Sequence, residues 1–363
     1  MHVNIKNRKV YVQPLGLLRG CSDSDRMFLR LNGGDTFFSA LKIYVRNGCK
    51  VSEQIISVFD LADYLNKQTL EIRLEIEALI ENITCECPAL KLKGGLKLDW
   101  HKPLIQGVLN VTPDSFSDGG KFEGQECALS HAREMISAGA DIIDVGGEST
   151  KPGARAVSID VEKERVLSVI INLAQLNTPI SIDSRNAKVM SAAMAVGSHI
   201  INDVSALTHD RHSTKVVVET DAPVILMHTQ GTPESMQNDP KYQNILLDIY
   251  DYLEARINHC IDHGISKDKI IVDPGIGFGK TVAHNLQIIA GLTIFHGLGV
   301  PLLLGVSRKS FIGKITGEKT PEKRVSGSVA AALSCVEKGV QIVRVHDVEH
   351  TVQALEITRA LAQ

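Results

Sequence analysis

From residue 103 onward, short apolar runs alternate with stretches in which apolar side chains recur at helical spacing. Each apolar run is rich in Val, Ile and Leu and leads into a loop with Gly, Asp, Asn or Ser. This alternation is typical of βα units, in which helices join parallel strands. The predicted strands are Pro103–Val111, Asp141–Gly147, Pro179–Ser184, His199–Ser205, Pro223–His228, Lys269–Gly275, Pro301–Ser307 and Ile342–Asp347. The predicted helices include Glu126–Ala138, Val161–Leu176, Asn186–Val196, Asn244–His263, Arg324–Lys338 and His350–Leu361.

Eight such units indicate an α/β fold of the (β/α)8 barrel type. Residues 103–363 have the length of a typical barrel of this kind, which is about 250 residues. A doubly wound sheet also alternates strands and helices. The first predicted strand is not followed by a dinucleotide-binding fingerprint, and this favours the barrel.

The first hundred residues follow a different pattern. Val10–Leu18 and Met27–Leu31 resemble strands, whereas Phe37–Val45, Val51–Leu65 and Leu70–Ile83 carry apolar residues at helical spacing. A stretch at 91–100 fits a strand–turn–strand or a linker. We therefore expect a small α+β domain at residues 1–98, without a catalytic cluster, ahead of a barrel domain at 99–363. A structural, lid or oligomerisation role fits such a segment.

Composition narrows the classes of protein. The chain has 363 residues, of which 44% are hydrophobic and 22% charged, so it can bury a full core. Its net charge is −3 and its charges are dispersed, so we expect no nucleic-acid partner. The amino-terminal residues lack a signal-peptide pattern, and no apolar run is long enough to span a membrane. These features predict a cytoplasmic protein with no membrane partner. The seven scattered cysteines indicate neither a disulfide framework nor a zinc site.

Polar residues gather where the predicted strands end. In a (β/α)8 barrel, functional groups lie at the carboxyl ends of the strands. One such residue alone fits a helix cap or a turn. Burying an unpaired polar group costs free energy, so their recurrence at successive strand ends favours a functional site. The residues are Asn110, Asp144, Asp183, Asn202, Asp203, His228, Asp273, Lys309, Arg344 and His346.

These side chains predict the chemistry of a ligand. The carboxylates and amide of Asp183, Asn202 and Asp273 suit a flat heterocycle with several donors and acceptors. Lys309, Arg344 and His346 follow the last two strands, where such barrels often bind phosphate. Asn110 offers an oxygen ligand that suits Mg²⁺ together with phosphate oxygens. The sequence therefore predicts a small-molecule substrate in which a heterocycle is joined to phosphate.

The glycine-rich phrase PGIGFGKT does not fit either common nucleotide motif. A P-loop would require Gly where Pro274 stands, and the dinucleotide motif requires a different spacing of its third glycine. We interpret it as a tight turn that brings Phe278 close to a substrate.

Together the motifs resemble dihydropteroate synthase, the pterin-binding folate-pathway enzyme that sulfonamides inhibit. The resemblance covers roughly residues 103–363. It is carried by GVLNVTPDSFSDGG, AGADIIDVGGESTKPGA, SIDS, INDVSA, ILMH, VDPGIGFGK, GVSRKSFIG and IVRVHDV. It implies a TIM barrel, usually a homodimer, and a transferase that joins 6-hydroxymethyl-7,8-dihydropterin pyrophosphate to p-aminobenzoate. The products would be 7,8-dihydropteroate and pyrophosphate, with Mg²⁺ present.

The resemblance also implies roles for individual residues. The pterin pocket would consist of Asp183, Asn202, Met227, Asp273, Gly305 and Lys309. The pyrophosphate and metal site would consist of Asn110, Arg344 and His346. The p-aminobenzoate cage would consist of Phe116, Thr150, Pro152, Phe278 and Ser310. Pyrophosphate would leave first, its charge offset by Mg²⁺, Arg344 and His346, and Asp183 would then stabilise the pterin methylene cation until the amine attacks.

One position departs from the family pattern. Lys151 stands where the second loop usually has Arg, and an ammonium cannot make the bidentate contacts of a guanidinium. We expect weaker ordering of that loop without loss of activity.

Two other functions remain open. One is a methyltransferase that passes a methyl group from methyltetrahydrofolate to a corrinoid protein, and the other is a non-catalytic pterin-binding protein. Neither needs the pyrophosphate site that the SRKS and RVHD phrases imply, so Mg²⁺-dependent pyrophosphate release distinguishes the synthase from both.

Overall fold

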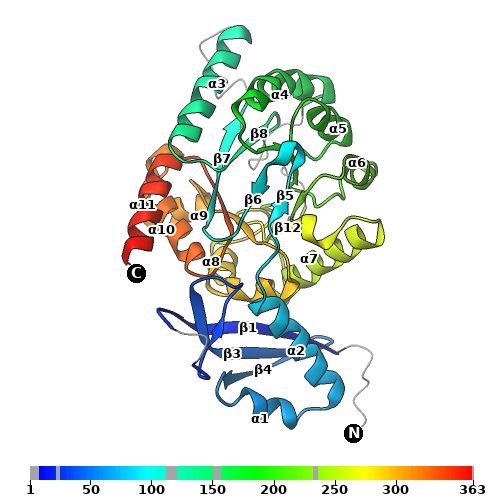
Figure 1. Cartoon of the computed structure of the whole chain (residues 1–363), viewed down its shortest axis with the longest axis vertical. Helices are drawn as coiled ribbons and strands as arrows, with labels where there is room; N and C mark the ends of the chain where they lie inside the picture. The colour runs from blue at the N-terminus through cyan, green and yellow to red at the C-terminus, as the bar shows by residue number, and fades with distance from the viewer. Residues whose placement is uncertain (1–7, 22–24, 112–120, 150–156, 232–235, 362–363) are drawn as a thin grey trace.

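The computed structural model describes residues 8–21, 25–111, 121–149, 157–231 and 236–361 (Figure 1). Within them, eight parallel strands form one sheet in the order β12-β11-β10-β9-β8-β7-β14-β13, and a bridge between Val272 and Leu302 joins its two ends. The strands are β7 (Leu104–Asn110), β8 (Ile142–Gly146), β9 (Ile180–Asp183), β10 (Ile200–Asp203), β11 (Val224–Met227), β12 (Ile270–Asp273), β13 (Leu303–Gly305) and β14 (Ile342–Val345). The predicted (β/α)8 barrel is confirmed, and every strand begins and ends within two residues of its prediction.

Helices surround the barrel (Figure 1). They are α3 (Lys121–Ser137), α4 (Ile159–Leu173), α5 (Ala187–Ala195), α6 (Ser213–Thr220), α7 (Ile245–Asp262), α8 (Val282–Ala290), α9 (Ser310–Thr316), α10 (Val325–Val336) and α11 (Val348–Leu361). Local sequence explains several of their starts. Ser158 caps α4, Asn244 caps α7, and Thr281 forms a reciprocal capping box with His284 at α8. These caps fix where the chain leaves the loops at the carboxyl ends of the strands.

A short hairpin closes the amino-terminal mouth of the barrel. It consists of β5 (Leu90–Lys91), the 3-10 turn η2 (Lys93–Gly95) and β6 (Lys97–Leu98). Its buried leucines pack in one apolar cluster with the first or second residues of seven barrel strands. The cluster is Leu90, Leu92, Leu98, Leu104, Ile142, Ile200, Ile225, Ile271, Leu303 and Ile342. Apolar side chains therefore fill the interior of the barrel at this end.

The segment before the barrel is a small α+β unit, as predicted. Its antiparallel sheet consists of β1 (Arg8–Arg19), β2 (Leu29–Arg30), β3 (Thr36–Asn47) and β4 (Lys50–Ser57), and α1 (Leu61–Asn66) and α2 (Leu70–Thr84) follow. Helix α2 and the hairpin agree with the predicted helix and strand–turn–strand. The predicted strand Met27–Leu31 is reduced to the two residues of β2.

Two helices predicted in this unit are wrong. Phe37–Val45 lies in β3, and the first half of Val51–Leu65 lies in β4. Both faces of β3 are covered, since Ile43 packs in the core of the sheet and its own helices while Tyr44 packs in the barrel core. A strand buried on both faces loses the period-two pattern, and its aromatic and β-branched residues then indicate the strand better than their spacing does.

The sheet of this unit packs on α7 and on the 3-10 segment η6 (Leu292–Leu298). Tyr11 meets Tyr250 of α7 edge to face, with ring centroids 5.3 Å apart. Its hydroxyl donates to Asp251 at 2.8 Å, and the same carboxylate accepts from Lys9 at 2.5 Å and Arg46 at 3.0 Å. These contacts hold the sheet against the side of the barrel.

We propose residues 1–98 as the amino-terminal unit and residues 99–363 as the barrel unit. The hairpin is then the part of the first unit that reaches into the barrel mouth. Within the described residues, no helix is long and apolar enough to cross a membrane.

Candidate active site

The register of the sheet brings the last or next-to-last residues of the strands into one ring at the carboxyl end of the barrel. Neighbouring members pair directly across adjacent parallel strands. The pairs are Asn110–Gly146, Gly146–Asp183, Asp183–Asn202, Met227–Asp273 and Gly305–Arg344. Seven of the nine residues predicted for the pterin pocket and for the pyrophosphate and metal site therefore lie in this ring, and Lys309 and His346 lie in the loops after β13 and β14.

Arg344 connects three strands of the ring. Its Nε donates to Asp144 Oδ2 at 2.6 Å and its Nη2 donates to Asp183 Oδ2 at 2.8 Å. Asp144 is fully buried and also accepts from Ser181 at 2.5 Å and from the Asn202 amide at 3.2 Å. The buried carboxylate thus fixes both the arginine and the amide at the edge of the mouth.

Asp183 has one oxygen to spare. Its Oδ2 binds Arg344, but its buried Oδ1 accepts no hydrogen bond from any residue in the described ranges. Burial raises the pKa of Asp183 to about 7, although the charge of Arg344 acts in the opposite direction. A buried acceptor without a partner is costly, so this atom is suited to a ligand that donates a hydrogen bond.

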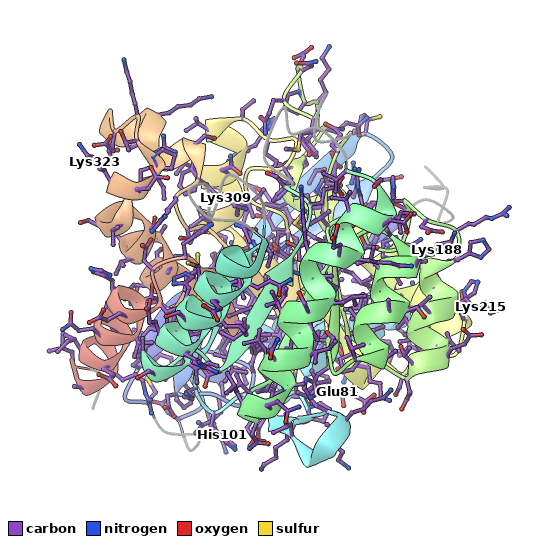
Figure 2. All side chains as sticks on the ribbon, turned by 90° about the horizontal axis from the view of Figure 1, so that it is seen from above. Glu81, His101, Lys188, Lys215, Lys309 and Lys323 are labelled. Atoms are coloured by element: carbon purple, nitrogen blue, oxygen red, sulfur yellow. The ribbon has the colours of Figure 1, made fainter. Side chains whose placement is uncertain are left out.

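Lys309 reaches the ring from the loop after β13. Figure 2 shows it lying inward, whereas Lys188 and Lys215 extend from the outer rim. Its ammonium donates to the carbonyl of Ile276 and lies 4.6 Å from the centre of the Phe278 ring. Burial lowers the pKa of Lys309 to about 8, while the charge of Asp273 supports its protonated form.

Asp273 is held by the glycine turn that follows it. Its Oδ1 accepts from the Gly275 amide at 2.7 Å, and burial raises its pKa against the opposing charge of Lys309. Gly275 has a φ of +72°, and a Cβ there would lie 1.9 Å from the His228 carbonyl oxygen. Glycine is required at this turn. The turn interpretation of PGIGFGKT is therefore consistent with the backbone.

The loops after β13 and β14 bind each other. The Ser307 hydroxyl accepts from the His346 amide at 3.1 Å and lies 3.0 Å from His346 Nδ1. Arg308 makes a two-point ion pair with Asp347, at 2.5 and 3.0 Å. Ser310 is the first residue of α9. This linkage fixes Lys309, which stands between Arg308 and Ser310.

Lys280 is a buried lysine behind the ring. Its ammonium donates to the carbonyls of Phe278 at 2.9 Å and His228 at 3.3 Å, and lies 2.9 Å from His228 Nδ1. Burial and the neighbouring ammonium lower the pKa of His228 to about 2, so its imidazole is neutral and its Nδ1 can accept. Tyr242 donates to the Gly279 carbonyl at 2.8 Å. Together these bonds hold the loop that carries Phe278.

The sequence placed Asp144 among the polar residues at the strand ends but gave no role to it or to Asp347, and it did not select Lys280. A single acid within the apolar run of β8 was a signal for Asp144, since such a charge needs a buried partner. No local sequence pattern indicates that Lys280 lies beside His228, because 52 residues separate the two along the chain.

Four predicted site residues lie outside the described residues. They are Phe116, Thr150, Lys151 and Pro152.

The residues at the mouth fit a weakly ligated cation better than a dedicated metal cage. A Cβ added to Gly146 would lie 3.6 Å from both Asn110 Oδ1 and Asp183 Oδ2, so the two oxygens flank one glycine. The described residues contain no cluster of three or more His, Cys, Asp or Glu side chains placed to hold a metal. One amide oxygen near a carboxylate is compatible with Mg²⁺ that takes its other ligands from phosphate and water.

Comparison with known proteins identifies the family. Residues 106–346 match the model of the pterin binding enzymes. Dihydropteroate synthase of Escherichia coli K12 is 45% identical over 267 residues, which cover 73% of this chain and 94% of the relative.

Solved structures agree. The dihydropteroate synthase of Yersinia pestis, in a sulfonamide drug complex, superposes with a TM-score of 0.72 at 44% identity and covers 76% of this chain and 99% of its own. That of Xanthomonas albilineans, in complex with 7,8-dihydropteroate, has a TM-score of 0.69 at 40% identity and covers 76% and 98%. The family model, the sequence identity and the structural similarity lead to the same assignment. The chain belongs to the pterin-binding enzymes and, among them, to the dihydropteroate synthases.

Proposed function

We propose that the mouth of the barrel condenses 6-hydroxymethyl-7,8-dihydropterin pyrophosphate with p-aminobenzoate, giving 7,8-dihydropteroate and pyrophosphate. The observation that carries this proposal is the buried Oδ1 of Asp183, which has no partner among the described residues and lies beside Arg344. The Xanthomonas structure with 7,8-dihydropteroate supports the product.

In this proposal the pterin ring binds inside the strand-end ring. Its N–H and amino groups donate to Asp183 and Asp273, and the amide of Asn202 completes the polar edge. Met227 and Gly305 line the sides, and Lys309 donates to a ring acceptor. The ligand thereby supplies the hydrogen bond that Asp183 Oδ1 lacks.

The pyrophosphate lies toward Arg344 and His346. Two guanidinium nitrogens of Arg344 bind Asp144 and Asp183, so its orientation is fixed before a ligand arrives. Preorganised charge of this kind stabilises negative charge as it develops on a leaving group. We propose that Asn110 contributes to a Mg²⁺ site here, and Mg²⁺ would supply further neutralisation of the pyrophosphate.

The reaction proceeds in two stages. The bond between the methylene carbon and the pyrophosphate oxygen breaks, and its electron pair leaves with the pyrophosphate. The carboxylate of Asp183 stabilises the cation that remains on the pterin methylene. The amine of p-aminobenzoate then forms the new carbon–nitrogen bond and loses one proton to solvent.

The p-aminobenzoate ring is proposed to lie against Phe278, whose ring also lies 4.6 Å from the ammonium of Lys309. Its carboxylate rests near Ser310, at the start of α9. Phe116, Thr150 and Pro152 complete this cage, with Lys151 beside them. We expect sulfonamides to compete with p-aminobenzoate at this position. We further propose that the enzyme is a homodimer and acts in the cytoplasm, and light scattering of the purified protein tests the first point.

The test is pyrophosphate release by the full chain. We expect release only when both substrates and Mg²⁺ are present, and its loss on addition of chelator. Asp183→Asn should reduce the rate at least a hundredfold, whereas Asp160→Asn, at an exposed position of α4, should leave it unchanged. Pterin binding without release would favour a pterin-binding protein, and methyl transfer to a corrinoid would favour the methyltransferase.

A further inference from the structure

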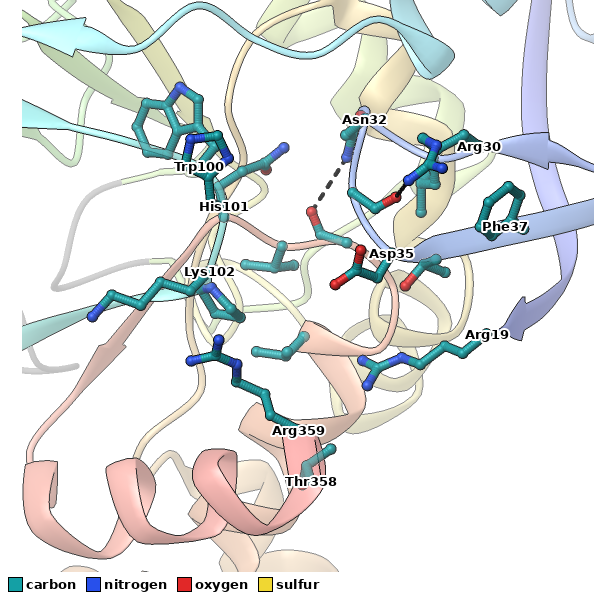
Figure 3. A pocket seen from close by; sticks show the side chains of 18 of the residues that line it. Arg19, Arg30, Asn32, Asp35, Phe37, Trp100, His101, Lys102, Thr358 and Arg359 are labelled. Carbon is teal, nitrogen blue, oxygen red and sulfur yellow. Dashed lines mark hydrogen bonds between the residues drawn. The ribbon is translucent and has the colours of Figure 1, made fainter. Parts of the chain in front are cut away.

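A second cavity, of about 390 Å³, lies at the other end of the barrel (Figure 3). Its barrel wall includes Lys102 and Pro103, which precede β7, and Gln341, which precedes β14. The ring of the active site lies at the carboxyl ends of the same strands, so the length of the barrel separates this cavity from the active site. The remaining wall comes from the amino-terminal unit, and small-molecule sites often form between two such units.

Hydrogen bonds between the two units hold this cavity in shape. Asn32, in the turn after β2, lies with its amide 3.0 Å from His296 Nδ1 of η6 and donates to the Gly339 carbonyl at 3.3 Å. Arg30 donates to the Gly34 carbonyl at 2.8 Å, and its guanidinium lies 4.7 Å from the centre of the Phe37 ring. The wall contributed by the amino-terminal unit is therefore formed before a ligand binds.

The lining carries an excess of cations. Arg19, Arg30, Lys102 and Arg359 face it, against the single carboxylate of Asp35. Lys102 is already paired with Asp141 at 2.7 Å.

Two of these arginines have no ionic partner in the described part of the chain. Arg19 ends β1 and Arg359 lies in the last turn of α11, yet no ion pair between described residues includes either side chain or Asp35. Figure 3 shows both guanidinium groups extending into the cavity from different elements, with the Asp35 carboxylate in the same space. Guanidinium groups that line one cavity from different elements suit an anion such as a phosphate group, to which each can make two hydrogen bonds.

A flat aromatic surface lies on the same lining. The indole of Trp100 borders the cavity, and its Nε1 donates to the Pro88 carbonyl at 2.9 Å, which fixes the orientation of the ring. An immobilised indole beside a cationic cluster can stack a heterocyclic base.

We propose that this cavity binds a nucleoside phosphate. The phosphate lies between Arg19 and Arg359, a sugar hydroxyl donates to Asp35, and the base lies against Trp100. The ligand bridges the amino-terminal unit and α11 of the barrel, so its binding strengthens the attachment of the two units.

The chain offers a direct readout, because Trp100 is its only tryptophan. Titration of the full chain with ATP should quench the fluorescence of Trp100 and saturate at one site. Arg19→Gln and Arg359→Gln should each raise the dissociation constant about tenfold, since each removes a charge-assisted hydrogen bond. Arg73→Gln is the matched control, because Arg73 is exposed on α2 and bonds Glu77 and Asn66 of its own unit.

Three results would overturn the proposal. ATP that leaves the fluorescence unchanged excludes a base at Trp100. Binding that Arg344→Gln abolishes while Arg19→Gln and Arg359→Gln leave it intact places ATP in the active site instead. If ribose 5-phosphate binds as tightly as AMP, the cavity is a general anion site that does not recognise the base.

Discussion

Arg344 Nε donates to Asp144 Oδ2 at 2.6 Å, across the strand β7 that separates their own strands. Asp144 is fully buried and Arg344 lies at the rim of the mouth, so the pair connects the interior of the barrel to the site. Removing Asp144 leaves Arg344 with Asp183 as its ionic partner, so the guanidinium loses one of the two carboxylates that orient it.

Asp144→Asn should therefore impair the enzyme although Asp144 touches no proposed substrate. We expect kcat/KM to fall by about ten- to a hundredfold, the range for losing one preorganised charged contact. The KM for p-aminobenzoate should change less than kcat, since the amine binds on the Phe278 side. Steady-state kinetics of Asp144→Asn, compared with the exposed control Asp160→Asn, measure the effect. Unchanged kinetics would show that Asp144 does not support the active site.

Activity should depend on pH in the form of a bell. Burial raises the pKa of Asp183 to about 7, and the proposed role requires its ionised form. Burial lowers the pKa of Lys309 to about 8, and the proposed role requires its protonated form. The value of kcat/KM should rise about tenfold per pH unit toward 7 and fall above 8. Asp183→Asn should abolish the acidic limb, and a flat profile in the parent enzyme from pH 5 to 9 would contradict both roles.

Stability should respond to the same carboxyl group. The pKa of Asp183 lies above the value of about 3.9 expected in the unfolded chain, so the folded state binds more protons between these values. The contribution of Asp183 is fully present below pH 4 and is lost as pH rises through 7. Relative to the parent, Asp183→Asn should therefore gain stability between pH 4 and 7. Urea unfolding at both pH values measures this difference, and a difference that moves the other way would refute the burial argument.

The buried lysine behind the ring offers a separate test. Lys280→Met keeps the length of the side chain but leaves the Phe278 and His228 carbonyls without their donor. We expect a loss of about 1–3 kcal/mol in unfolding free energy and a higher KM for p-aminobenzoate, because Phe278 is no longer held. Lys215→Met, at an exposed position of α6, is the control. A loss of stability with an unchanged KM would show that Lys280 stabilises the fold without affecting the binding of p-aminobenzoate.

The hairpin that closes the amino-terminal mouth should matter for stability alone. Leu98→Ala, at a side chain that is 4% exposed, should cost about 2–5 kcal/mol. Leu96→Ala, on the half-buried side of the same hairpin, should cost less. Both variants should keep the parent KM values at a temperature where they are folded. A raised KM in Leu98→Ala would show that the hairpin also affects the geometry of the active site.

The second loop permits one comparison. Lys151→Arg restores the residue usual in the family, and we expect the parent enzyme to be within tenfold of that variant in condensation activity. A larger deficit in the parent would show that an ammonium cannot replace the guanidinium there.

The barrel could be predicted from sequence because its strands are apolar runs of four or more residues that end in polar groups. Asp183 and Asp273 are the last residues of their strands and Asn202 is the last but one, and the parallel register then brings them to the same end of the barrel. The strand β3 could not be predicted, since burial on both faces removes its alternation. The partner of Asp144 was equally hidden, because only closure of the barrel brings Arg344 beside it, 200 residues along the chain.

The central claim is that Asp183 serves the condensation by binding the pterin and stabilising its methylene cation. The most direct measurement is the formation of 7,8-dihydropteroate by the parent chain and by Asp183→Asn, followed by mass spectrometry, with pterin binding measured in parallel. We predict that Asp183→Asn forms product at least a hundredfold more slowly than the parent and binds the pterin more weakly. Product formed at the parent rate by Asp183→Asn would contradict the account.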